Sequence, residues 1–265
     1  MPLRASTLNS RQQQMKTLTF LSITLLSGAI AGCILGLINL AVVEPFIDKA
    51  IGIETQRQIS AGLTIDPIQQ SNYRIWQKEG AIVASTIYGI SLSALFGIIY
   101  AYSRNSSLLA RANSNKKKAL LLAGIMFTVL FLVPSLKYPA NPPTVGSPTT
   151  VYYRESFYIG FIAISGFSCL ALALIFRKRL VNSNTPSKLK EKIAIPVLLY
   201  FVIMGSAYLL FPSNPDKITI PMDLVTSFRI VGAFTIGIFW GLMGLMLGSF
   251  WDKLEIDETR KFASI

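Results

Sequence analysis

Hydrophobic residues are concentrated in six long runs, which polar or proline-containing segments separate. A helix needs about 20 mostly apolar residues to cross the roughly 30 Å of hydrocarbon in a bilayer. None of the six runs contains Asp, Glu, Lys or Arg, and a charged residue at the centre of a span costs about 3 kcal/mol. The pattern predicts an all-α, polytopic membrane helix bundle with about six transmembrane helices, at residues 18–43, 80–102, 119–136, 157–176, 193–211 and 230–250.

Basic residues are distributed unequally among the segments outside the runs. The two chain ends and the second and fourth connections hold 17 Lys and Arg residues, whereas the other three connections hold eight. Under the positive-inside rule, this asymmetry places both termini in the cytoplasm. The expected division is a cytoplasmic N-terminal segment at 1–17, a six-helix transmembrane domain at 18–250 and a cytoplasmic tail at 251–265.

Composition excludes several other classes of protein. Only 14% of the residues are charged, against about 25% in soluble domains. Histidine is absent, which removes Ser-His-Asp and Cys-His catalysis and imidazole metal ligands. There is no GxxxxGK[ST] motif for a nucleotide phosphate, and we expect no enzyme. The net charge of +12 follows the asymmetry of the connections, so no nucleic-acid partner is expected.

The first run also has features of a processing signal. Lys16 precedes it, and the residues before Cys33 resemble a lipoprotein cleavage box. The apolar run continues beyond Cys33, which makes it too long for the hydrophobic region of a signal peptide. This length favours an uncleaved first helix, with cleavage or lipidation as the open alternative.

The connections expected outside the cell differ from those inside. The first, 44–79, is long and acidic, and its segment 47–59 could form an amphipathic helix lying on the membrane surface. The third contains Pro134, Pro139, Pro142 and Pro143, so it should be stiff, extended and non-helical. Rigid backbone at the mouth of a bundle can line a substrate entrance, and the alternative is that the prolines only end helices.

These external segments carry a resemblance to a known family. Glu44-Pro45, residues 136–146 and Tyr153-Arg154 are similar to segments of the CbtA family of probable cobalt transporter subunits. The resemblance implies a multi-pass protein of a prokaryotic cell membrane, in a transport system for a divalent metal ion, cobalt, or for a cobalamin-related solute. It also implies pairing with a small one-helix CbtB-like subunit. The entrance residues expected from this segment are Lys137, Tyr138, Pro139, Asn141, Pro142, Pro143 and Arg154.

The chain departs from that family in two ways. Family members are usually described with fewer spans, and the missing histidines remove the most natural ligand for cobalt. The alternative is a non-transporting accessory subunit that packs in a larger membrane complex. Outside transport of a divalent cation, no cofactor is expected.

Acidic residues near the ends of the runs are the candidates for a metal or substrate site. Carboxylate oxygens suit hard divalent cations, and the alternative is a set of solvated charges. Glu44 is singled out because the resemblance includes it. The two cysteines, Cys33 and Cys169, are interpreted as apolar packing residues, with a thiolate pair as the alternative. The candidate metal or substrate residues are Glu44, Asp48, Glu155 and Asp223.

Glycine spacing in the first and sixth runs predicts close helix packing. Glycines four residues apart let backbones approach where lipid supplies no hydrophobic drive. We expect these two runs to make the tightest contacts, with each other or across a homo-oligomer, although chance spacing is the alternative. The helix-packing glycines are Gly28, Gly32, Gly36, Gly237, Gly241, Gly244 and Gly248.

Overall fold

Six long helical segments form a bundle in the computed structural model. It describes residues 2–104, 106, 109, 112–181 and 186–263, and within these the side chains of residues 17–176 and 192–254. The described chain is 85% helical with no strand, and six of its helical segments are long and apolar enough to span a membrane. The predicted fold class is confirmed. The elements are α1 (Pro2–Val42), α2 (Glu44–Ser60), α3 (Pro67–Ser103), α4 (Asn115–Phe127), the π-helix η2 (Thr128–Leu132), α5 (Val133–Lys137), the 3-10 helix η3 (Pro148–Thr150), α6 (Val151–Val181), α7 (Pro186–Leu210) and α8 (Met222–Ala263).

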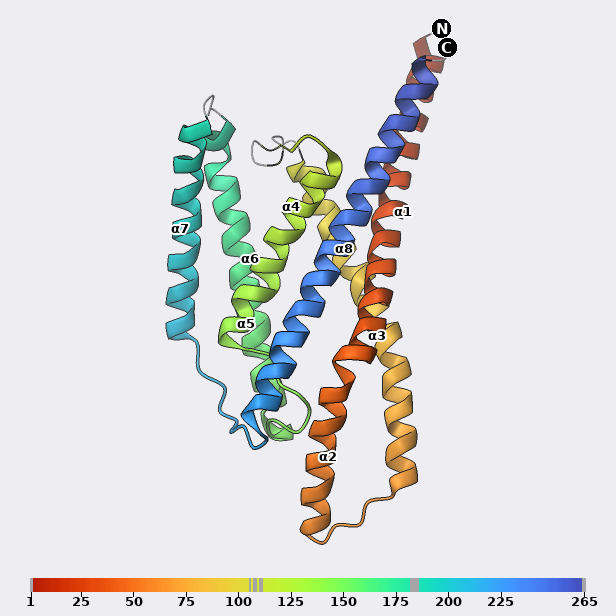
Figure 1. Ribbon diagram of the computed structural model, residues 1–265. Helices are drawn as coiled ribbons and strands as arrows, with labels where there is room; N and C mark the ends of the chain where they lie inside the picture. The colour runs from red at the N-terminus through yellow and green to blue at the C-terminus, as the bar shows by residue number, and fades with distance from the viewer. Residues whose placement is uncertain (1, 105, 107–108, 110–111, 182–185, 264–265) are drawn as a thin grey trace.

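The helical ends nearest both termini lie at the same end of the bundle, as an even number of spans requires (Figure 1). α1 begins at Pro2 and α8 continues to Ala263, so both terminal segments extend a span as helix. The protein is thus a multi-pass membrane protein. The placement of this end in the cytoplasm stays a prediction from the charge asymmetry.

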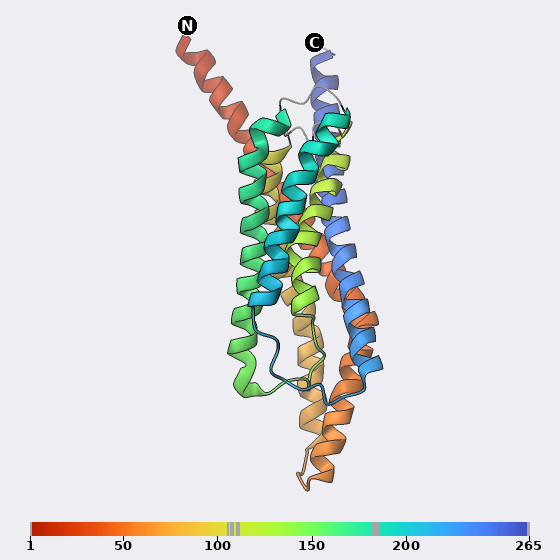
Figure 2. The ribbon, with the colours of Figure 1, turned by 90° about the vertical axis from the view of Figure 1, so that its left-hand side faces the viewer.

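The connection between the first two spans is a helical hairpin, and its course differs from the prediction. Segment 47–59 is helical, but it belongs to α2, which continues beyond the bundle beside the first part of α3 (Figures 1 and 2). The expectation that it lies along the membrane surface is therefore wrong. Helical hydrogen bonding runs through Val43, whose N–H donates to Asn39 and whose carbonyl accepts from Phe46. Glu79, expected in a loop, lies within α3.

α1 and α3 pack with their backbones almost in contact. A Cβ on Gly89 of α3 would lie 2.2 Å from the carbonyl oxygen of Gly28. A Cβ on Gly32 would lie 2.3 Å from the carbonyl oxygen of Ser85, and one on Gly36 would lie 2.4 Å from the Ser85 hydroxyl oxygen. All three predicted glycines of α1 therefore face α3. The expectation that this face meets the sixth span or a second copy of the chain is wrong, because α3 covers it.

α8 makes its own close contact with α4. A Cβ on Gly248 would lie 2.4 Å from the Cα of Lys116, and one on Gly244 would lie 2.9 Å from the carbonyl oxygen of Ala119. Gly237 meets only a phenylalanine ring at 3.6 Å, and Gly241 has nothing within 4 Å. The glycine spacing correctly predicted a close helix contact at five of the seven glycines, but it could not predict which helix the contact is made with.

The bundle has two apolar cores with different helices. The first core joins α1, α3, α4 and α8 around Phe96, Tyr100, Trp240 and Met243, all of which are buried. The second core joins η2 and α5 to α6 and α7 around Phe161, Tyr200 and Met204. The third predicted span, which passes from α4 through η2 to α5, contributes to both cores.

Candidate functional site

The end of the bundle opposite the termini gathers the candidate site residues. There α1 passes into α2 beside α3, and the loops before α6 and α8 cross the ends of the helices (Figures 1 and 2). The connections at this end contain eight basic and eight acidic residues, whereas the remaining segments contain 17 basic and five acidic residues. The connections at this end are thus formally neutral, and the net charge of +12 comes from the segments at the end that holds the termini.

Glu44 and Asp48 lie together and share one arginine. Nη2 of Arg74, on α3, donates to Glu44 and to Asp48, the latter at 2.9 Å, and Lys78 Nζ lies 2.8 Å from the second oxygen of Asp48. The side chain of Glu44 is 11% exposed, that of Asp48 47%. The hydrogen bond from Lys78, followed by that from Arg74, lowers the pKa of Asp48 below its ordinary value. Two carboxylates and two cations therefore form a neutral network.

Glu155 and Asp223, the other two predicted acidic residues, lie outside this network. Both are exposed, at the start of α6 and of α8. Among the described residues, no group of three His, Cys, Asp or Glu side chains lies close enough to hold a metal ion. A cation bound at Glu44 and Asp48 would need water or carbonyl oxygens to complete its coordination. The four-residue metal site stays a prediction, for which the structure brings two members together.

The predicted entrance loop is tied to α7 at its beginning. Lys137 Nζ lies 4.6 Å from the centre of the Tyr208 ring, and the Tyr138 hydroxyl donates to the carbonyl oxygen of Pro212 at 2.7 Å. Burial, with a smaller effect of Tyr153, raises the pKa of Tyr138 above its ordinary value. The chain leaves the helix irregularly after Tyr138, as the prolines predict.

The middle of this loop is a tight turn around Pro142, which is buried. The N–H of Val145 bonds the carbonyl of Pro142 at 3.4 Å, and Thr144 adopts a φ of +77°. A side chain with a Cβ is strained there, and the Thr144 hydroxyl is buried without a hydrogen-bond partner. Gly146, with a φ of +105°, leaves room for the Arg154 guanidinium. Residues 139–147 of the loop are therefore non-helical, as expected for a segment rich in proline.

Three arginines fix the two loops by binding backbone carbonyl groups. Arg154 donates to Val145 and Ser147 and forms an ion pair with Asp216 at 2.9 Å, which ties the two loops together. Arg229 donates to the carbonyl of Ala140 at 3.2 Å and to the Asn141 side chain at 2.6 Å. The side chains that do this are Arg57, Arg154 and Arg229.

Sequence reasoning found Arg154 and Asn141 but not Arg57, Asp216 or Arg229. For Arg229 the sequence held one indication. It is the basic residue directly before the sixth apolar run, where a guanidinium group needs hydrogen-bond acceptors. Nothing in the sequence specifies that those acceptors are carbonyl oxygens of a loop 88 to 89 residues away.

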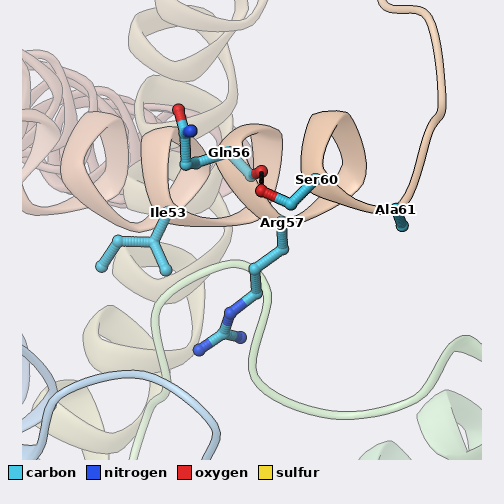
Figure 3. Close-up of a pocket in the computed structure, with 5 residues that line it drawn as sticks. All are labelled: Ile53, Gln56, Arg57, Ser60 and Ala61. Carbon is cyan, nitrogen blue, oxygen red and sulfur yellow. Dashed lines mark hydrogen bonds between the residues drawn. The ribbon is translucent and has the colours of Figure 1, made fainter.

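A shallow depression of about 500 Å³ opens beside the end of α2, lined by Ile53, Gln56, Arg57, Ser60 and Ala61 (Figure 3). Arg57 points across it toward the neighbouring loop, where it donates to the Thr219 hydroxyl at 3.1 Å and to the Thr219 carbonyl. Arg57 is the only charged residue in this lining, so the depression has no carboxylate for a cation.

The cysteines do not form a disulfide. Both are free, and Cys169 packs against the second apolar core on α6. Cys33 lies on α1, between the glycines that face α3. For Cys169, the packing agrees with its interpretation as an apolar filler.

Comparison with known proteins gives one family. A family model described as "Probable cobalt transporter subunit (CbtA)" matches residues 17–252, from the start of the first span into the last helix. No curated protein and no solved structure matches the chain.

Proposed function

The chain belongs to the CbtA family of probable cobalt transporter subunits, and on that premise we propose that it is the membrane-spanning subunit of a transport system in a prokaryotic cell membrane. The proposed solute is a divalent metal ion, with cobalt as the first candidate, or a cobalamin-related solute. The observation that carries the proposal is the family match over residues 17–252, which contains the apolar part of all six spans. This match supports a role as a subunit of a transport system and not a role as an enzyme.

The sequence supports the participation of a partner. The six runs contain no Asp or Glu, the residues that proton-coupled transporters commonly use within the membrane. The chain also lacks a phosphate-binding motif for a nucleotide. Energy for uptake then comes from the ion gradient or from another protein. We propose a small one-helix CbtB-like subunit as the partner that completes the path.

The neutral network at α2 and α3 is the proposed capture site. Together Arg74 and Lys78 carry two positive charges, the same charge as one divalent cation. An ion that replaces them at Glu44 and Asp48 neutralises the two carboxylates, and the exchange then requires that the Arg74 and Lys78 side chains turn outward to solvent. Carboxylate oxygens and water are suitable ligands for such an ion.

The transport proposal is tested by metal accumulation in cells. Deletion of the gene is expected to lower accumulation of cobalt, and re-expression should restore it. Unchanged accumulation of cobalt, nickel and manganese would contradict transport of a metal ion. Co-purification of the chain with a large stable membrane complex, together with unchanged uptake, would favour the accessory-subunit alternative.

The capture site has its own test. Glu44→Gln should weaken the apparent affinity for cobalt uptake by at least about tenfold, the loss typical of a damaged metal site. Glu79→Gln is the matched control, because Glu79 is an exposed residue of α3 outside the network. Equal uptake by both variants would remove Glu44 from the site and leave the transport proposal standing. The metal content of the purified protein provides a second measurement.

A further inference from the structure

One face of α3 carries exposed apolar side chains along most of its length. At about 100° per residue, Trp76, Val83, Ile87, Ile98 and Tyr102 lie within about 100° of one another around the helix. All five are exposed, Trp76 at 65% and Tyr102 at 86%. The face is therefore an aliphatic strip with one aromatic side chain at each end.

The same face becomes polar beyond Trp76. Asn72 and Gln69, which lie toward the start of α3, are exposed amide side chains. Ile68 is also exposed in this segment, but it lies about 80° from Trp76 around the helix. Tyr73 is exposed and stacks against Trp76, with ring centroids 5.8 Å apart. Because Trp and Tyr are enriched where a membrane meets water, this sequence of side chains indicates that the bilayer ends near Trp76.

The length of the strip matches the thickness of a bilayer. Trp76 and Tyr102 are about 39 Å apart along the axis of α3, at 1.5 Å per residue. A bilayer is about 30 Å thick in its hydrocarbon and about 40 to 45 Å thick with its headgroups. Both aromatic side chains therefore fall in the headgroup layers. The midpoint between them is Gly89, where α1 and α3 are in close contact.

Two other helices carry aromatic side chains at the level of Tyr102. The ring centroid of Trp251 on α8 lies 5.2 Å from that of Phe20 on α1, and Phe20 in turn lies 6.3 Å from Tyr100 on α3. Tyr102 is about 3 Å from Tyr100 along the helix axis. Aromatic side chains of three helices thus gather at one level, at the end of the bundle that holds the termini (Figure 1).

We propose that the exposed pair of Tyr73 and Trp76 binds the lipid headgroup layer at the bilayer surface opposite the termini. The partner of this face is lipid and not a second protein chain, because the apolar strip has the length of a bilayer and the face becomes polar where the bilayer ends. The part of the α2–α3 hairpin beyond Tyr73 then stands in water. This agrees with the course of the hairpin away from the rest of the bundle (Figure 2).

The same placement sets the level of the network of Glu44 and Asp48. Arg74 and Lys78 come two residues before and two residues after Trp76, so each lies within about 3 Å of it along the axis and on the other side of α3. The network therefore lies at the level of the headgroups, and cations are concentrated beside anionic headgroups. A cation captured there comes from this layer. This consequence rests on the proposed function, whereas the position of Trp76 in the bilayer does not.

Quenching of tryptophan fluorescence by brominated lipid tests the position of Trp76. The purified full-length protein is placed in phosphatidylcholine vesicles whose acyl chains carry bromine either near the headgroup or near the methyl end. The difference between wild type and Trp76→Phe isolates the signal of Trp76 from those of Trp240 and Trp251. We expect bromine near the headgroup to quench this signal more than bromine near the methyl end.

Two matched probes calibrate the depth. Gln69→Trp and Val83→Trp, each in a chain carrying Trp76→Phe, place a tryptophan about 10 Å to either side of position 76 on the same exposed face. The probe at position 83 should be quenched most by bromine near the methyl end. The probe at position 69 should be quenched by iodide in the water and not by brominated lipid. All three positions are exposed, so we expect the variants to fold.

Three outcomes would overturn the proposal. Quenching of Trp76 by iodide but not by brominated lipid would place the pair in water. Quenching by neither would show that protein, either a second copy of the chain or a partner subunit, covers the pair. Strongest quenching by bromine near the methyl end would place Trp76 deep in the hydrocarbon. No metal is added, so a failure here leaves the transport proposal standing.

Discussion

The two helix groups of this bundle are held together by different means. In the group of α1, α3, α4 and α8, glycines let one backbone lie against another, as at Gly28 and Gly89. In the group of η2, α5, α6 and α7, glycines have no such role, since Gly205 has nothing within 4 Å and Gly160 meets only a ring at 3.6 Å. Aromatic side chains and the Ser165–Tyr200 pair join these helices instead.

This difference follows from the solvent. Lipid chains are as apolar as leucine, so burial of apolar surface gives helices little reason to associate in a membrane. Close backbone packing supplies many contacts that a single altered side chain cannot replace. Side-chain packing with a few hydrogen bonds can rearrange at lower cost. We therefore expect the first group to be rigid and the second to be adjustable.

The largest expected effect comes from Gly89→Ala. The added Cβ would lie 2.2 Å from a backbone oxygen of α1, so the two helices must separate. We expect a loss of about 3 kcal/mol in the free energy of unfolding, the upper part of the range for overpacking. Thermal unfolding in detergent measures it. Gly205→Ala on α7 is the control and should change stability by less than about 0.5 kcal/mol. Equal effects would end the distinction between the two groups.

The second prediction concerns the contact between α4 and α8. Asp252 of α8 accepts hydrogen bonds from the backbone N–H groups of Asn115 and Lys116 at 2.9 and 3.1 Å, at the N-terminus of α4. Asp252→Asn removes the charge from this cap and should cost about 2 kcal/mol. Hydrogen exchange at residues 115–118 should become faster in the variant. Glu79→Gln, which removes an exposed charge, should leave that exchange unchanged.

A smaller effect is expected where the second group meets the loops. Tyr138→Phe removes only the hydroxyl that donates to the Pro212 carbonyl, so we expect a loss of about 1 kcal/mol. Hydrogen exchange should increase in the loop 211–221, with the α1 and α3 pair unaffected. Tyr152→Phe is the control, because Tyr152 is 82% exposed. Faster exchange in α1 would show that the two groups unfold together.

The sequence predicted the spans well because the membrane imposes a simple condition on them. A run without charged residues of the required length has few alternatives to a transmembrane helix, and all six runs are helical. The glycine spacing predicted close packing of α1, but a small face fits any other small face. Gly28 therefore could not indicate that its partner is Gly89.

The candidate site was less predictable, because its partners are set by tertiary structure. Glu44 and Asp48 were found as carboxylates near the first span, but Arg74, which donates to both, lies 26 to 30 residues away on α3. Pro134 was interpreted as the beginning of a stiff loop. In the structure it lies within the third span, just after the π turn, and Ser165 on another helix donates to that turn.

The smallest expected effect on stability comes from the ion pairs of Asp48, which join α2 to α3 beyond the contact between α1 and α3. The pKa of Asp48 is lowered mainly by Lys78, so its carboxylate contributes stability that is fully present above the ordinary Asp pKa of about 3.9. This contribution is lost as the pH falls through the lowered pKa. Because the Asp48 side chain is 47% exposed, solvent screens the pair and the contribution should stay below about 1 kcal/mol.

The variant Asp48→Asn tests this pH dependence. The difference in thermal stability between wild type and variant should be constant from pH 7 to about pH 5 and should shrink toward zero as the pH falls below about 4. Lys78→Met should remove most of the same difference while leaving Asp48 in place, because Lys78 is the largest cause of the lowered pKa. A difference that grows on acidification would mean that the folded protein raises this pKa instead. A loss as large as that of Gly89→Ala would mean that ion pairs, and not backbone contact, hold α1 and α3 together.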